Sequence, residues 1–254
     1  NSSNKNLTLE LIDYLELPIT GDKSNDRVSG VMARGGVLRD EPGNNHRAFI
    51  NDLTGPLYIY DKKSKQLVTY LNLNGSEGHN GLFPKFTSAM GYAAGLVNFV
   101  FDPEYVKNGV FYTLHMENAI SPGETATPKP DKVTGLNLEG YSTSAALLPP
   151  IPVNPRGVRE MVIVEWTDKQ IGNSTFEGTA REVLRLQLPG IFHPLNEMIF
   201  NPTAKKGDSD WKVMYLGVGD AGTGERPGPT RYYAQRLDNY QGKVLRIIPS
   251  LNEH

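Results

Sequence analysis

The feature that most constrains this chain is a strand-and-turn pattern that occurs twice. The segments NFVFDPEYVKNGVFYTLHM, beginning at Asn98, and EMIFNPTAKKGDSDWKVMYLGVGD, beginning at Glu197, each open with an apolar run that ends in Phe-Asp-Pro or Phe-Asn-Pro. Proline cannot donate to a β-ladder and disfavours a helical residue before it, so each run should end there as a strand. A polar turn and a second strand follow in both copies. The repeat predicts an all-β chain built from similar hairpins.

The remainder of the chain supports this fold class. The 26 Gly and 18 Pro residues separate short strand-like runs, and few stretches show helical apolar spacing. Repeated hairpins are typical of propeller blades of about four strands each, with a β-sandwich as the alternative. The segment 119–155 is rich in Pro, Thr and Ser, and we interpret it as an excursion between strands of one domain spanning residues 1–254. Four further runs are predicted to contain strands: Leu57–Leu73, Val158–Trp166, Arg181–Leu188 and Gly242–Pro249.

Composition excludes several classes of function. Lys and Arg total 26 against 28 Asp and Glu, for a net charge of −2, so nucleic acid is not an expected partner. No apolar run approaches the roughly 20 residues that span a bilayer. The chain has no cysteine, which excludes disulfides, thiolate metal sites and cysteine nucleophiles.

Glycosylation sequons provide one indication of cellular location. Asn-x-Ser/Thr occurs at Asn1, Asn6, Asn74 and Asn173. The contexts of Asn6, Asn74 and Asn173 are polar and turn-like, which makes these three the glycosylation candidates.

One histidine and one aspartate are predicted to meet. His193 precedes the strand EMIF, and Asp220 follows the strand KVMYLGVG. If these strands form a hairpin, reflection about its midpoint places the two residues opposite each other, barring a bulge. A carboxylate beside an imidazole fixes its tautomer and stabilises its protonated form, which makes His193 a candidate general base. The alternative is a loop histidine with no catalytic task.

Two other motifs are set aside. Gly217, Gly219 and Gly222 form Gly-x-Gly-x-x-Gly after a strand, but the residues that follow cannot open a helix, so a dinucleotide site is rejected. Asp208 and Asp210 alternate as calcium ligands can, but we interpret their loop as a solvated turn. No metal ligand is therefore assigned.

Three segments together resemble the soluble quinoprotein family of glucose and aldose sugar dehydrogenases, which depend on pyrroloquinoline quinone (PQQ). GLVNFVFDPEYVKNGVFYTLH, from Gly95, resembles the family's blade motif. HPLNEMIFNP with VMYLGVGDAGTGE resembles its catalytic histidine segment and Gly-Asp loop, and AQRLDNYQGKVLRI resembles its Ala-Gln-x-Leu segment. The segments occur in the family's order, from about residue 90 to 247, and the N-terminal segment 1–50 matches nothing we can name.

The resemblance implies an extracytoplasmic enzyme with a six-bladed β-propeller fold, of which this chain supplies about half to two-thirds. PQQ and calcium are the implied cofactors, and the family's quinone-binding arginines and most calcium ligands lie beyond this sequence. His193 would remove a hydroxyl proton while hydride passes to PQQ. The implied location is secreted, periplasmic or cell surface. The chain is then either a fragment or completed by a second polypeptide; the electron acceptor is unknown.

Departures from the family pattern bear on the substrate. Phe192 stands where glucose-oxidising members carry an acidic sugar contact, and Ala93 and Ala94 stand where they place a glutamine. The family's histidine and aspartate are kept while its sugar contacts are not. We therefore expect a small-molecule sugar or related alcohol rather than glucose itself. The alternative function is a non-catalytic propeller of the same descent, serving as a surface or matrix glycoprotein.

Overall fold

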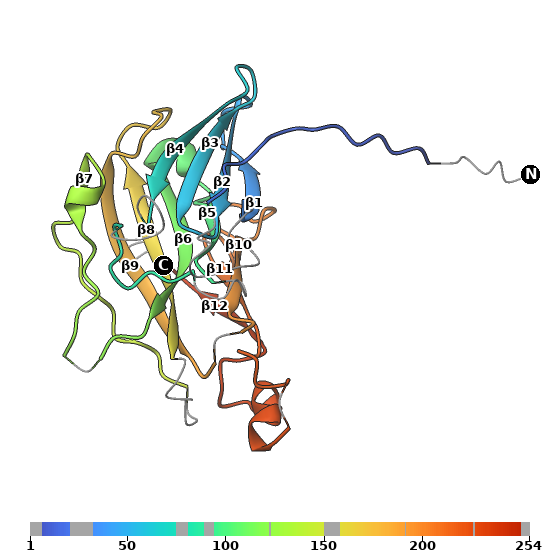
Figure 1. The fold of residues 1–254 in the computed structure, drawn as a ribbon, viewed down its shortest axis with the longest axis vertical. Coiled ribbons are helices and arrows are strands. Elements are labelled where there is room, and N and C mark those ends of the chain that lie inside the picture. The colour runs from blue at the N-terminus through green and yellow to red at the C-terminus, as the bar shows by residue number, and fades with distance from the viewer. Residues whose placement is uncertain are drawn as a thin grey trace, which may run out of the picture.

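The fold was obtained as a computed structural model, which describes residues 7–20, 33–74, 81–88, 94–121, 123–149, 158–190, 192–225 and 227–249. Within these ranges the all-β prediction is confirmed, since helix is limited to three short segments (Figure 1). The strands are β1 (Gly35–Asp40), β2 (Arg47–Asp52), β3 (Pro56–Asp61), β4 (Gln66–Asn72), β5 (Leu96–Phe101), β6 (Val110–Asn118), β7 (Leu136–Asn137), β8 (Arg159–Asp168), β9 (Gly178–Leu188), β10 (Leu195–Phe200), β11 (Met214–Val218) and β12 (Lys243–Ile247). The helical turns are α1 (Tyr105–Asn108), η2 (Pro130–Lys132) and η3 (Pro229–Gln235).

These strands form three sheets that follow the order of the chain. The first sheet is the antiparallel meander β1-β2-β3-β4. The second has the order β5-β6-β8-β9, with short β7 added in parallel outside β9. The third is β10-β11-β12. Successive meanders of this kind are the blades of a β-propeller.

The first strands of the three sheets, β1, β5 and β10, lie beside one another (Figure 1). Arg39 of β1 donates through Nε to the carbonyl of Phe99 in β5 at 2.9 Å. The side chain of Asn98 in β5 donates in turn to the carbonyl of Asn196 and to Glu197 in β10, at 3.1 Å each. Polar side chains thus link the blades along their inner edges.

Two apolar cores fill the spaces between neighbouring blades. One joins the first and second sheets and is rich in aromatic residues, with Phe49, Phe99, Phe111 and Trp166 all buried. The other joins the second and third sheets through smaller residues such as Met198 and Leu216. The second sheet therefore buries both faces, which explains the nearly continuous apolar run in β8.

The repeat seen in the sequence is a structural repeat. The hairpins β5-β6 and β10-β11 both carry a register shift near their inner ends, between Leu96 and Asn98 in one and between Leu195 and Glu197 in the other. In both copies the strand ends before the Asp-Pro or Asn-Pro dipeptide, as proline requires.

The two ends of the described chain show features that the sequence did not predict in detail. β1 and β2 show that part of the segment 1–50, which resembled nothing named, belongs to the first blade. Residues 7–20 form no strand and extend away from the sheets at their N-terminal end (Figure 1). At the other end β12 is the edge of the third sheet, and no described strand pairs with its outer side. The described blades do not close a ring, as expected for part of a propeller.

The excursion predicted at 119–155 runs between β6 and β8 and covers one side of the second sheet. Its described part contains η2 and β7, and Leu147 forms a parallel bridge with Leu186 of β9. None of the described helices is long and apolar enough to cross a bilayer.

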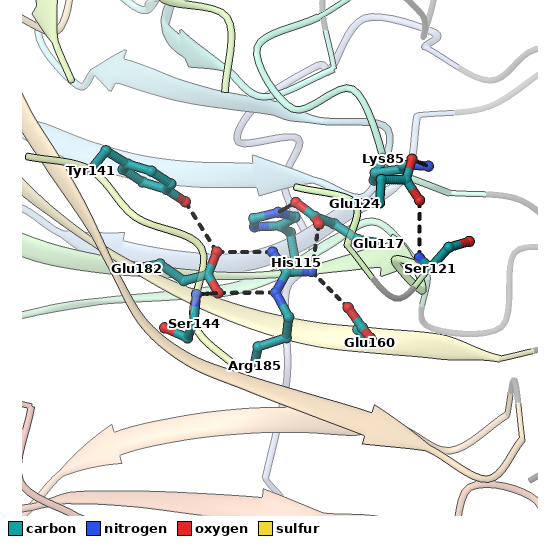
Figure 2. A network of polar contacts seen from close by, with 10 residues as sticks. All are labelled: Lys85, His115, Glu117, Ser121, Glu124, Tyr141, Ser144, Glu160, Glu182 and Arg185. Atoms are coloured by element: carbon teal, nitrogen blue, oxygen red, sulfur yellow. Dashed lines mark hydrogen bonds and ion pairs between the residues drawn. The ribbon is translucent and has the colours of Figure 1, made fainter. Parts of the chain in front are cut away.

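Beneath this excursion lies a buried ionic network centred on Arg185 of β9 (Figure 2). Its guanidinium makes a bidentate pair with Glu182 at 3.0 and 2.8 Å. Nη1 also donates to Glu117 of β6 at 2.7 Å and to Glu160 of β8 at 2.8 Å. The register shift in β9 lies between the partners of Ile163 and Val164, so Glu182 and Arg185 share a face although they are three positions apart in the sequence.

Candidate functional site

His193 and Asp220 lie at the same end of the β10-β11 hairpin. Met198 pairs with Leu216 inside the hairpin, and this register alone would place His193 opposite residue 221. The register shift after Glu197 moves the pairing by one residue, so Leu195 faces Val218 and His193 comes opposite Asp220. The predicted apposition is present, and the bulge is needed to produce it.

The two side chains are in hydrogen-bond contact. His193 Nδ1 lies 3.0 Å from Asp220 Oδ1. The imidazole is more than half exposed, whereas the carboxylate is about three-quarters covered, with side-chain exposures of 56% and 24%. The imidazole therefore meets solvent while its partner is anchored in the loop.

Asp220 is held by the turn that follows it. Its Oδ1 accepts the backbone N–H of Gly222 and its Oδ2 that of Gly224, both at 2.9 Å. Burial works against the charged form, but these two N–H groups and the contact with His193 hold the pKa of Asp220 below its ordinary value of 3.8. The carboxylate is consequently ionised and fixed at neutral pH.

The backbone on both sides of this contact is strained. His193 has φ 43° and Ala221 has φ 55°, in the left-handed region that side chains with a Cβ seldom adopt. Such strain persists only where neighbouring contacts determine the conformation, and it gathers at functional sites. Here the Ala221 N–H donates to the carbonyl of His193 at 3.1 Å, which locks the two loops together.

The site contains a third residue, Glu225, which the sequence analysis did not identify. Glu225 Oε1 lies 3.2 Å from His193 Nε2, so the imidazole stands between two carboxylates. The only sequence signal was an acidic residue at the end of the segment GDAGTGE, within the same loop as Asp220.

The Gly-x-Gly-x-x-Gly motif has a steric role. A Cβ at Gly219 would lie 2.3 Å from the carbonyl oxygen of His193, and one at Gly222 would lie 3.0 Å from the ring of Phe192. The helical element after the motif is the 3₁₀ turn η3, separated from it by several residues, and no helix opens on the motif. The rejection of a dinucleotide site agrees with this geometry.

Gly219→Ala should therefore disturb the site through a steric clash alone. The added methyl would press on the His193 backbone, so we expect a loss of about 1–3 kcal/mol in the free energy of unfolding. Urea unfolding measures this change. Gly217→Ala is the matched control, because its Cβ would meet only the Glu197 side chain at 3.2 Å. Equal stability of the two variants would contradict the close packing of the loops.

The residues around His193 do not by themselves fit PQQ or calcium. Both groups that contact the imidazole are carboxylates, which repel a tricarboxylate such as PQQ. Among the described residues no arginine or lysine contacts His193, Asp220 or Glu225, and Arg236 is paired with Asp238. In the same part of the chain no group of three or more His, Asp or Glu is arranged to hold a metal ion. Asp208 and Asp210 accept hydrogen bonds within their own loop, from the backbone N–H of Lys205 and from Asn201.

The glycosylation candidates differ in accessibility. Asn74 is buried, and its side-chain nitrogen donates to the carbonyl of Thr54 at 2.9 Å, so the folded chain does not present this nitrogen. Asn173 lies in the turn between β8 and β9 and is partly exposed. Asn1 and Asn6 lie outside the described residues.

Comparison with known proteins gives a distant likeness. No protein-family model matches the chain, and no curated protein matches it. Solved structures described as "glucose dehydrogenase" and "Crystal structure of glucose dehydrogenase" match at 14% identity, with TM-scores of 0.48 and 0.46. The matches cover 84% of this chain and 47% and 44% of theirs, so the chain spans less than half their length. Similarity at this level does not establish a function.

Proposed function

We propose that this chain is part of an extracytoplasmic dehydrogenase that oxidises a sugar or related alcohol, with PQQ as the hydride acceptor that the sequence resemblance implies. The observation that carries the proposal is the contact between His193 Nδ1 and the ionised Asp220. It is supported by the three sequence segments that resemble this family.

The role of His193 follows from the direction of that contact. Asp220 accepts the Nδ1 proton, which leaves the lone pair of the neutral imidazole on Nε2. Nε2 can then accept the proton of a substrate hydroxyl, and Asp220 stabilises the imidazolium that forms. General-base assistance of this kind is worth about 10²–10⁴-fold in rate.

The cofactors remain proposals that rest on the resemblance. Because the carboxylates around His193 repel PQQ, and no group of described residues is arranged to hold a metal ion, residues outside the described ones would have to hold PQQ and calcium. The secreted, periplasmic or cell-surface location is proposed on the same basis, with partly exposed Asn173 as the described glycosylation candidate.

The neighbourhood of His193 favours a substrate other than glucose. Phe192 packs against Gly222, where a Cβ would lie 3.0 Å from its ring. The sequence resemblance implies that Phe192 stands where glucose-oxidising members carry an acidic sugar contact. A substrate with an apolar face beside the reacting hydroxyl group fits such a neighbour.

The direct test uses the full-length protein with PQQ and calcium added. Reduction of an artificial electron-accepting dye should depend on PQQ and on an aldose or secondary alcohol from a panel of such compounds. NAD in place of PQQ is the control and should give no reduction. PQQ binding without turnover of any tested alcohol would contradict the enzymatic proposal and favour a non-catalytic propeller.

A further inference from the structure

Both nitrogens of His193 are occupied, each by a carboxylate from the same loop. Nδ1 lies 3.0 Å from Asp220 and Nε2 lies 3.2 Å from Glu225. A neutral imidazole carries one N–H and can donate to one carboxylate at a time. The contact with Glu225 is therefore attractive only while Nε2 carries a proton, and a substrate hydroxyl group cannot use Nε2 until Glu225 has moved away.

The two carboxylates are held very differently. Asp220 accepts hydrogen bonds from two backbone N–H groups in addition to His193. Glu225 is 53% exposed, and among the described residues its polar contact is with His193 alone. An exposed ion pair of this kind contributes about 0.2–1 kcal/mol, so a ligand displaces Glu225 more readily than Asp220.

We infer that Glu225 is a displaceable gate on His193, occupying Nε2 in the ligand-free protein and giving way to a hydroxyl-bearing ligand. The inference adds to the proposed function and rests on it, because a gate on Nε2 affects catalysis only if His193 is the general base. Once displaced, the Glu225 carboxylate remains beside the site and can accept a hydrogen bond from a second hydroxyl group. The chemistry therefore favours a neutral polyol with adjacent hydroxyl groups and disfavours sugar acids, whose carboxylate the two acidic residues repel.

The gate can be tested without cofactor or substrate. Diethyl pyrocarbonate acylates an unprotonated imidazole nitrogen, and mass spectrometry of peptides follows the reaction at His193 specifically. Removing a contact worth up to about 1 kcal/mol should accelerate modification of His193 by about two- to fivefold in Glu225→Ala. Glu225→Gln keeps a hydrogen-bonding side chain and should remain closer to the wild-type rate.

The matched control is Glu139→Ala, which removes an exposed glutamate elsewhere on the surface. It should leave modification of His193 unchanged. A rate in Glu225→Ala equal to that in wild type and Glu139→Ala would overturn the gate. Circular dichroism confirms that the variants are folded, as expected for substitutions at exposed positions.

The substrate class is tested in the active, cofactor-loaded protein. Glu225→Gln should raise kcat/KM for a uronic acid relative to the corresponding neutral aldose by about twofold or more, because one repelling charge is removed. An unchanged ratio would contradict the inferred selectivity.

Different experimental results would contradict the gate and the proposed function. Dehydrogenase activity together with modification of His193 that does not respond to Glu225→Ala would contradict the gate and leave the proposed function standing. Accelerated modification of His193 in a protein that oxidises no tested alcohol would contradict the proposed function and leave the gate standing.

Discussion

Replacing His193 with alanine is expected to lower the turnover of the full-length, cofactor-loaded protein by about 10²–10⁴-fold, because the substrate hydroxyl group loses its general base. The fold should be spared. The imidazole is more than half exposed and contributes little packing, so the free energy of unfolding should change by about 0.5 kcal/mol or less. Steady-state kinetics with thermal unfolding measures both quantities.

Two further variants sharpen this test. His46→Ala removes an exposed histidine outside the site and should leave turnover unchanged. Asp220→Asn keeps the shape of the side chain but can select the wrong imidazole tautomer, so it should reduce turnover more than stability. Turnover of His193→Ala within a few-fold of wild type would show that another group takes the proton.

Replacing Arg185 with leucine is expected to cost about 3–5 kcal/mol in the free energy of unfolding, because three carboxylates would remain buried without their cation. Glu117, Glu160 and Glu182 all contact this guanidinium, whose side chain is completely buried (Figure 2). Urea unfolding at neutral pH measures the loss. A variant too unstable to purify would agree with this expectation, and one as stable as wild type would contradict it.

Arg181→Leu is the matched control on the same strand. Arg181 pairs with Glu165 at 2.8 Å, but its side chain is 33% exposed. Water screens this pair, so its loss should cost at most about 1 kcal/mol. The difference between the two arginine variants isolates the effect of burial.

The effect of Arg185 should also depend on pH. Burial raises the pKa of Glu117, but the hydrogen bond from His115 and the charge of Arg185 outweigh it and hold this pKa below its ordinary value of 4.5. A carboxylate with a depressed folded-state pKa stabilises the protein above its unfolded-state pKa and loses that contribution as pH falls through the folded value. The stabilities of wild type and Arg185→Leu should therefore converge as the pH is lowered below about 4.5. A gap that stays constant into the acid range would contradict the electrostatic origin of the loss.

The parts of the site that sequence predicted are those set by local geometry. A hairpin pairs residues at equal distances from its turn, so a strand, a polar loop and a second strand were enough to bring His193 and Asp220 to the same end of the sheet. The bulge that completes this apposition was not visible in the sequence. Its position matches the register shift in the β5-β6 hairpin, which connects it to the repeat rather than to the site alone.

The contact of Glu225 with His193 could not be predicted in the same way. Glu225 lies in an irregular loop, where no strand or helix period fixes the direction of a side chain. Its position depends on the turn built by Asp220, Gly222 and Gly224, whose hydrogen bonds appear only in the folded structure.

By itself the sequence determined most of the strands, their ends at Asp-Pro and Asn-Pro, and the position of His193 and Asp220 at one end of a hairpin, because each depends on residues close together in the chain. Only the tertiary structure decided which charged residues would be buried. Arg185 lies on a strand whose sequence gives no sign of burial, and Glu117 is 68 residues away. The excursion between β6 and β8 covers their face of the sheet, and that cover turns an ordinary polar strand face into a buried ionic network. Burial of this kind results from packing between segments that are distant in the chain, so a local sequence pattern does not predict it.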